Sequence, residues 1–147
     1  MSTGFDLQCV AELARRPHLR DSGAVFTAGE RAHCRSRPDP DASLTGLLSA
    51  KEAFIKALSS MGGAPACSFP EIEVGHGPAG QPRLRLHGDV GRWCRERNIA
   101  AELSISHSGG MAGAVVVLLA EPHATTAQAA TAHGTTTIGT TSGGNPS

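Results

Sequence analysis

The segment from Leu47 to Leu58, LLSAKEAFIKAL, constrains the fold of this chain more than any other part of it. It contains neither glycine nor proline and consists largely of good helix formers, so it predicts an α-helix. Glu52 and Lys56 stand four residues apart and share one face, while the large apolar side chains point mainly toward a core. Such a pair is either a surface ion pair, worth roughly a few tenths of a kcal/mol, or a place where a divalent cation and a phosphate oxygen are held together.

Shorter elements are predicted on both sides of this helix. We expect strands over residues 4–10, 71–74, 83–87, 102–107 and 112–119, and helices over residues 11–16, 28–37 and 90–97. Ser43 is a suitable N-cap for the long helix, and the Pro38-Asp39-Pro40-Asp41 segment before it is typical of a linker. The last predicted strand is continuously apolar, which predicts that both of its faces are buried.

Composition bounds the domain organisation and the classes of partner. The chain of 147 residues predicts one folded domain over residues 3–120 and a Thr/Ala/Gly-rich tail over residues 121–147, which we expect to be disordered. The 13 Lys and Arg residues balance the 13 Asp and Glu residues, so the net charge favours neither nucleic acid nor a membrane as partner. No apolar run reaches the roughly 20 residues of a membrane helix. The four cysteines form no C-x-x-C pair, which favours reduced thiols and a cytoplasmic location.

Three further residues are candidates for chemistry, and each also has a plainer interpretation. Asp6 is the one carboxylate in an otherwise apolar strand, so it needs a cation, hydrogen bonds or solvent, unless it caps a turn. Glu30 stands three residues after Thr27, the spacing of a capping box, and could alternatively bind a metal ion. His107 ends a predicted strand beside a glycine-containing turn, where it could contact phosphate or make a structural hydrogen bond. No G-x-S-x-G, H-E-x-x-H or Walker motif accompanies them.

Taken in chain order, these signals resemble the 4′-phosphopantetheinyl transferase superfamily, in particular its small holo-acyl-carrier-protein synthase type. The motifs are Gly4-x-Asp6, Phe26-Thr27-x-x-Glu30-x-x-x-Cys34, Ala50-Lys51-Glu52-Ala53-x-x-Lys56-Ala57, Glu71-Ile72-Glu73, Gly80-x-Pro82 and Leu103-Ser104-Ile105-Ser106-His107. Together they cover residues 4–119, nearly the whole predicted domain. In the larger, two-lobed type of this superfamily the histidine element precedes the lysine–glutamate element. Here Lys51 and Glu52 precede His107, so the resemblance is to the small type.

The resemblance implies a fold, an assembly and a reaction. The fold would be α+β, with a mainly antiparallel sheet and a long packed helix, and three chains would form a homotrimer with active sites between subunits. Coenzyme A would donate its 4′-phosphopantetheine arm to a serine of an apo acyl or peptidyl carrier protein, and 3′,5′-ADP would leave. Mg²⁺ would be the metal, since hard oxygen ligands and substrate phosphate hold it. Asp6 and Glu52 match the metal-binding carboxylates of the family, and Glu30 matches a further acidic position near the metal.

The remaining site residues implied by the resemblance are cationic. Lys56 matches a lysine near the diphosphate of coenzyme A and the incoming hydroxyl, so Asp6, Glu52 and Lys56 are the expected catalytic residues. Lys51 matches a lysine that contacts phosphate, and His107 matches a histidine near the 3′-phosphate of coenzyme A. Whether a carboxylate or a metal-bound water takes the proton of the serine stays open, as does the carrier's pathway, which could make fatty acids, polyketides or peptides.

The chain also departs from the family pattern at several positions. Leu47 and Leu48 stand where the family often has an arginine and an aromatic residue, and Gln81 stands where a lysine is common. At Glu12 the family usually has a basic residue that faces the carrier protein. These departures leave a second hypothesis open, a non-catalytic homologue that binds coenzyme A or a carrier protein. A third hypothesis is a metal-dependent hydrolase of nucleotides, which no motif in the sequence supports.

Overall fold

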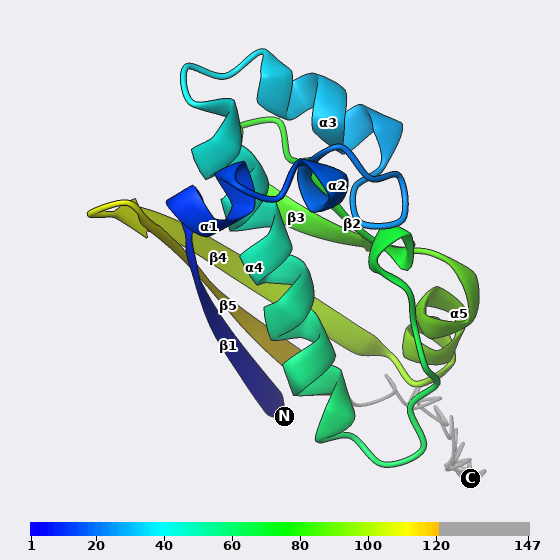
Figure 1. The fold of residues 1–147 in the computed structure, drawn as a ribbon. Helices are drawn as coiled ribbons and strands as arrows, with labels where there is room; N and C mark the ends of the chain where they lie inside the picture. Colours follow the sequence, from blue (N-terminus) through cyan, green and yellow to red (C-terminus); the bar gives the residue numbers. More distant parts are fainter. Residues whose placement is uncertain (121–147) are drawn as a thin grey trace, which may run out of the picture.

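The computed structural model describes residues 1–120, which form an α+β fold built on one long helix (Figure 1). Helix α4, Pro40–Ser59, lies across one face of an antiparallel sheet whose strand order is β1-β5-β4. These strands are β1 (Ser2–Cys9), β4 (Ile99–Ser108) and β5 (Met111–Ala120). A second antiparallel sheet pairs β2 (Ile72–His76) with β3 (Pro82–Leu86). The expected antiparallel sheet and long packed helix are thus confirmed, whereas the predicted tail over residues 121–147 lies outside the described residues.

Short helices complete the described chain. They are α1 (Val10–Ala14), α2 (Pro17–Arg20), α3 (Ala28–Arg35), the 3₁₀ turn η1 (Phe69–Glu71) and α5 (Gly88–Glu96). Helix α3 begins with the predicted capping box, in which the Thr27 and Glu30 side chains each accept a hydrogen bond from the other residue's backbone N–H. Among residues 1–120, none of the helices has the length and apolar character needed to cross a bilayer.

Helix α4 begins three residues before the predicted cap. Asp39 is its N-cap, and the Asp39 carboxylate accepts a hydrogen bond from the Ala42 backbone N–H at 2.9 Å. Pro40 occupies the first helical position, where the missing N–H costs nothing and the fixed φ suits a helix. The prediction that Ser43 caps the helix and that Pro40 and Asp41 belong to a linker is therefore wrong, because proline can start a helix as readily as it can end one.

Strand β1 packs very closely against α4, which sets the position of Asp6. A Cβ atom at Gly4 would overlap the Ala53 carbonyl oxygen and would lie 2.6 Å from the Ala57 backbone nitrogen. Only glycine leaves room for that approach, and the small side chains of Ala53 and Ala57, both 0% exposed, extend the close contact. Asp6, two residues after Gly4 on the same face of the strand, consequently points at the helix.

The opposite face of this sheet carries apolar side chains that the described chain leaves open. Phe5 is 56% exposed and Leu7 53% on β1, and Val115 and Leu119 on β5 are also exposed. The prediction that both faces of the last strand are buried is therefore wrong for the single subunit. The reason is that α4 lies on the inner face alone, so alternate residues of the continuous apolar run point outward.

Candidate functional site

Asp6 is a buried carboxylate with a cationic partner from α4. One oxygen, Oδ1, accepts a hydrogen bond from Lys56 Nζ at 2.7 Å, and the other, Oδ2, accepts one from Gln8 Nε2 at 2.8 Å. Lys56 also donates to the Phe5 carbonyl oxygen at 3.1 Å, and 53% of its side chain is exposed, against 8% for Asp6. A lone carboxylate in an apolar strand needs a cation or hydrogen bonds, and Asp6 has both, from Lys56 and Gln8.

Glu52 lies one helical turn before Lys56 and adds a second carboxylate to this group. Burial raises the pKa of the Glu52 carboxyl, the negative charge of Asp6 raises it further, and the ammonium of Lys56 opposes both effects. Two carboxylates thus share one lysine, and within residues 1–120 no group donates a hydrogen bond to the Glu52 carboxylate. The structure thus brings Asp6, Glu52 and Lys56 together from β1 and α4.

The donor set of this cluster fits a magnesium ion. Mg²⁺ prefers hard oxygen ligands and commonly binds through one or two carboxylates, with water and substrate phosphate completing its coordination. Asp6 and Glu52 provide that pair, and a cation between them would relieve the repulsion that raises the pKa of Glu52. No set of three His, Cys, Asp or Glu side chains in the described chain could hold a metal on its own.

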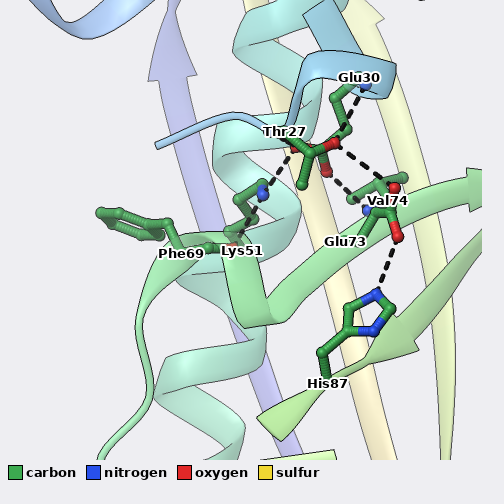
Figure 2. A network of polar contacts seen from close by, with 7 residues as sticks. All are labelled: Thr27, Glu30, Lys51, Phe69, Glu73, Val74 and His87. Carbon is green, nitrogen blue, oxygen red and sulfur yellow. Dashed lines mark hydrogen bonds and ion pairs between the residues drawn. The ribbon is translucent and has the colours of Figure 1, made fainter. Parts of the chain in front are cut away.

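Glu30 and Lys51 form a separate, fully buried ion pair (Figure 2). Lys51 Nζ donates to Glu30 Oε2 and to the Phe69 carbonyl oxygen, both at 2.9 Å. Glu30 also accepts hydrogen bonds from the backbone N–H of Thr27 at 2.8 Å and of Val74 at 2.7 Å. Through these contacts, both residues hold α3 and β2 against α4. The resemblance implies a metal contact for Glu30 and a phosphate contact for Lys51, whereas in the structure these two side chains contact each other and are 1% and 0% exposed.

His107 lines a cavity of about 430 Å³ beside the first half of α4. Its Nε2–H donates to the Ala42 carbonyl oxygen at 2.9 Å, and Gly46 gives the ring its place on the helix, since a Cβ there would lie 2.9 Å from Nε2. Leu47 and Pro82 form an apolar part of the cavity wall. Carboxylates are absent from the lining provided by residues 1–120.

The cavity and the carboxylate cluster are separate within one described subunit. None of Asp6, Glu52 and Lys56 lines the cavity, so the structure joins these three and places His107 elsewhere on α4. The cavity also contains two residues that sequence reasoning missed, His33 and His76. They come from α3 and β2, and no spacing in the sequence links them.

Comparison with known proteins identifies the family of the chain. Residues 2–113 match the family described as the 4′-phosphopantetheinyl transferase superfamily. A holo-[acyl-carrier-protein] synthase of Salinispora arenicola is 41% identical over 123 residues, covering 80% of this chain and 96% of the relative. One from Moorella thermoacetica is 35% identical over 121 residues, covering 80% of this chain and 93% of the relative.

Solved structures give the same result. The Chronobacterium ammoniagenes ACPS–CoA complex superimposes with a TM-score of 0.70 at 33% identity, covering 82% of this chain and 98% of that one. Family match, sequence relatives and fold thus agree over the region that carries Asp6, Glu52 and Lys56. This chain belongs to the 4′-phosphopantetheinyl transferase superfamily, of the holo-[acyl-carrier-protein] synthase type.

Proposed function

We propose that this protein is a holo-acyl-carrier-protein synthase. It transfers the 4′-phosphopantetheine arm of coenzyme A to a serine of an apo acyl or peptidyl carrier protein and releases 3′,5′-ADP. The observation that carries the proposal is the cluster of Asp6, Glu52 and Lys56, which β1 and α4 bring together in a chain of this family. A structural relative, the Chronobacterium ammoniagenes ACPS–CoA complex, supports coenzyme A as the donor.

The reaction places specific demands on these residues. The serine hydroxyl attacks the phosphorus bonded to the pantetheine oxygen and loses its proton. The bond from that phosphorus to the bridging oxygen breaks, and 3′,5′-ADP leaves with the bridging oxygen. Charge on the transferring phosphoryl group needs neutralising. Lys56 is anchored to Asp6 but half exposed, so its ammonium can face the diphosphate. Asp6 and Glu52 would hold Mg²⁺, which polarises phosphoryl oxygens when bound.

We also propose a homotrimer with active sites between subunits. The outward apolar side chains of Phe5, Leu7 and Val115 form a continuous unpartnered face, which includes a hollow of about 230 Å³. A second copy of the chain would cover that face. A neighbouring subunit could also bring a cavity with His107 to the carboxylate cluster, which one subunit alone keeps apart.

The carrier protein is the remaining partner. Exposed Arg15 and Arg16 follow α1 and provide positive charge for an acidic carrier, in place of the basic residue that the family usually has at Glu12. The alternative of a non-catalytic homologue rests on Leu47, an apolar residue in the cavity wall where the family often has arginine.

One assay tests the proposal. The full chain is incubated with coenzyme A, Mg²⁺ and apo carrier proteins, and mass spectrometry detects addition of the arm to the carrier serine. Transfer is expected for the wild type, loss for Glu52→Gln, and unchanged transfer for the matched variant Glu96→Gln, whose carboxylate is on the exposed surface of α5. A wild type that binds coenzyme A without transferring the arm to any carrier would favour the binding homologue. Full activity in Glu52→Gln would overturn the site.

A further inference from the structure

The cavity beside α4 contains a pair of stacked imidazole rings. His33, on α3, and His76, the last residue of β2, face one another with ring centroids 4.0 Å apart and planes inclined by 27°. His33 is half-buried and His76 is exposed. No Phe, Tyr or Trp lines this cavity among the described residues, so imidazoles are the aromatic rings that it presents to a ligand.

The surroundings of the pair favour the neutral form of the His76 ring. Burial lowers the pKa of the His76 imidazole, and the charges of His33, Arg37 and Arg85 lower it further. Arg37 also lines the cavity, and the Arg85 guanidinium lies beside Gly75, next to His76 in the chain. A neutral flat ring close to guanidinium groups suits a ligand that has both an aromatic base and phosphate.

We propose that the His33–His76 pair is a stacking surface for the adenine base of coenzyme A, with Arg37 beside it for a phosphate group. This inference rests on the proposed function and adds a residue pair that determines how the nucleotide is held. Histidine belongs to the side chains on which proteins stack nucleic-acid bases. The cavity volume, about 430 Å³, lies in the range of small-molecule sites. The apolar walls at Leu47 and Pro82 suit a base better than they suit a fully charged group.

The main competing interpretation is that His76 donates a hydrogen bond to a phosphate. That interaction needs an N–H or an imidazolium and is lost when the ring becomes a phenyl group, whereas stacking needs only a flat π surface. Phenylalanine at position 76 therefore separates the two interpretations. His18, exposed on α2 and outside the cavity, offers a matched histidine control.

The test is direct binding, measured by titration calorimetry on the full chain without carrier protein. The ligands are coenzyme A, 3′,5′-ADP, dephospho-coenzyme A and the base-free fragment 4′-phosphopantetheine. We expect His76→Ala to weaken both coenzyme A and 3′,5′-ADP by roughly 5- to 150-fold, the loss that follows removal of one base–aromatic stack. His76→Phe should bind both nearly as the wild type does. Affinity for 4′-phosphopantetheine should not change in either variant, and His18→Ala should bind every ligand normally.

Two results would overturn the stacking surface. If His76→Phe loses as much affinity as His76→Ala, and dephospho-coenzyme A is insensitive to both changes, His76 contacts the 3′-phosphate. If His76→Ala binds 3′,5′-ADP as tightly as the wild type, the pair does not touch the nucleotide. Because binding is measured apart from transfer, a wild type that binds coenzyme A but modifies no carrier refutes the proposed function alone. A wild type that binds no coenzyme A refutes both.

Discussion

Replacing Lys51 by methionine tests whether the first lysine of the Lys51-Glu52 motif is structural. Lys51 is 0% exposed, and its ammonium donates to Glu30 and to the Phe69 carbonyl at 2.9 Å each. Methionine keeps much of the volume but leaves the Glu30 carboxylate buried without its cation, although the N–H groups of Thr27 and Val74 still donate to it. Breaking a buried ion pair in this way costs about 3–5 kcal/mol.

The loss should appear in thermal or urea unfolding. For a folded domain of this size, each kcal/mol shifts Tm by about 4 °C, so Lys51→Met should unfold about 12–20 °C below the wild type. Adding Glu30→Gln should restore part of that loss, because it removes the unpaired charge while an amide oxygen can still accept from the backbone. A double-mutant cycle would then give a coupling of about 1–3 kcal/mol between the two positions.

Enzyme kinetics well below the lowered Tm complete this experiment. Folded Lys51→Met should retain the KM of the wild type for coenzyme A, since the ammonium is sealed from the solvent and from any phosphate. A structural role for Lys51 is refuted if the variant unfolds at the midpoint of the wild type while its KM for coenzyme A rises severalfold. That combination would mean that Lys51 contacts phosphate, as the family resemblance implied.

Three further changes separate the remaining features. Lys56→Met should lower kcat roughly 100-fold or more in the transfer assay. In unfolding experiments it should reduce the unfolding free energy by only about 1–2 kcal/mol, because Gln8 still donates a hydrogen bond to Asp6. Gly46→Ala should displace the His107 ring and raise the KM for coenzyme A roughly fivefold. Its unfolding free energy should stay nearly constant, because the better helix propensity of alanine contributes about 1 kcal/mol that offsets the displacement. Leu7→Asn should dissociate the proposed homotrimer in sedimentation velocity and change monomer stability by about 0.5 kcal/mol or less, because Leu7 is already exposed.

The cluster of Asp6, Glu52 and Lys56 is predictable because its signals are local. Glu52 and Lys56 are one helical turn apart, and a lone acid in an apolar strand such as Asp6 requires a partner. The role of Lys51 was not predictable in this way. Neighbouring residues on a helix point about 100° apart, and the sequence does not say which of Lys51 and Glu52 faces inward. Glu30 was correctly predicted to complete a capping box, but its other partners come from segments distant in the chain.

The fold shows the same division between local and distant information. Apolar patterning locates most of the strands. The prediction that both faces of β5 are buried is wrong, because burial depends on what covers each side of the sheet. The sequence pattern places Pro40 in a linker, whereas in the structure Pro40 is the first residue of α4. The His33–His76 stack has no sequence signal, since it exists only where α3 meets the end of β2.

Strand β1 has a consequence for the biosynthesis of the protein. Among residues 1–120, β1 pairs with β5 alone, from Ser2 opposite Leu118 to Cys9 opposite Met111. The strand that carries Asp6 is made on the ribosome about a hundred residues before its hydrogen-bonding partner, so the pair forms only after β5 has left the exit tunnel. Pairings of such long sequence separation slow folding. A nascent chain that contains β1 and α4 but not β5 therefore lacks the strand that pairs with the Asp6 segment.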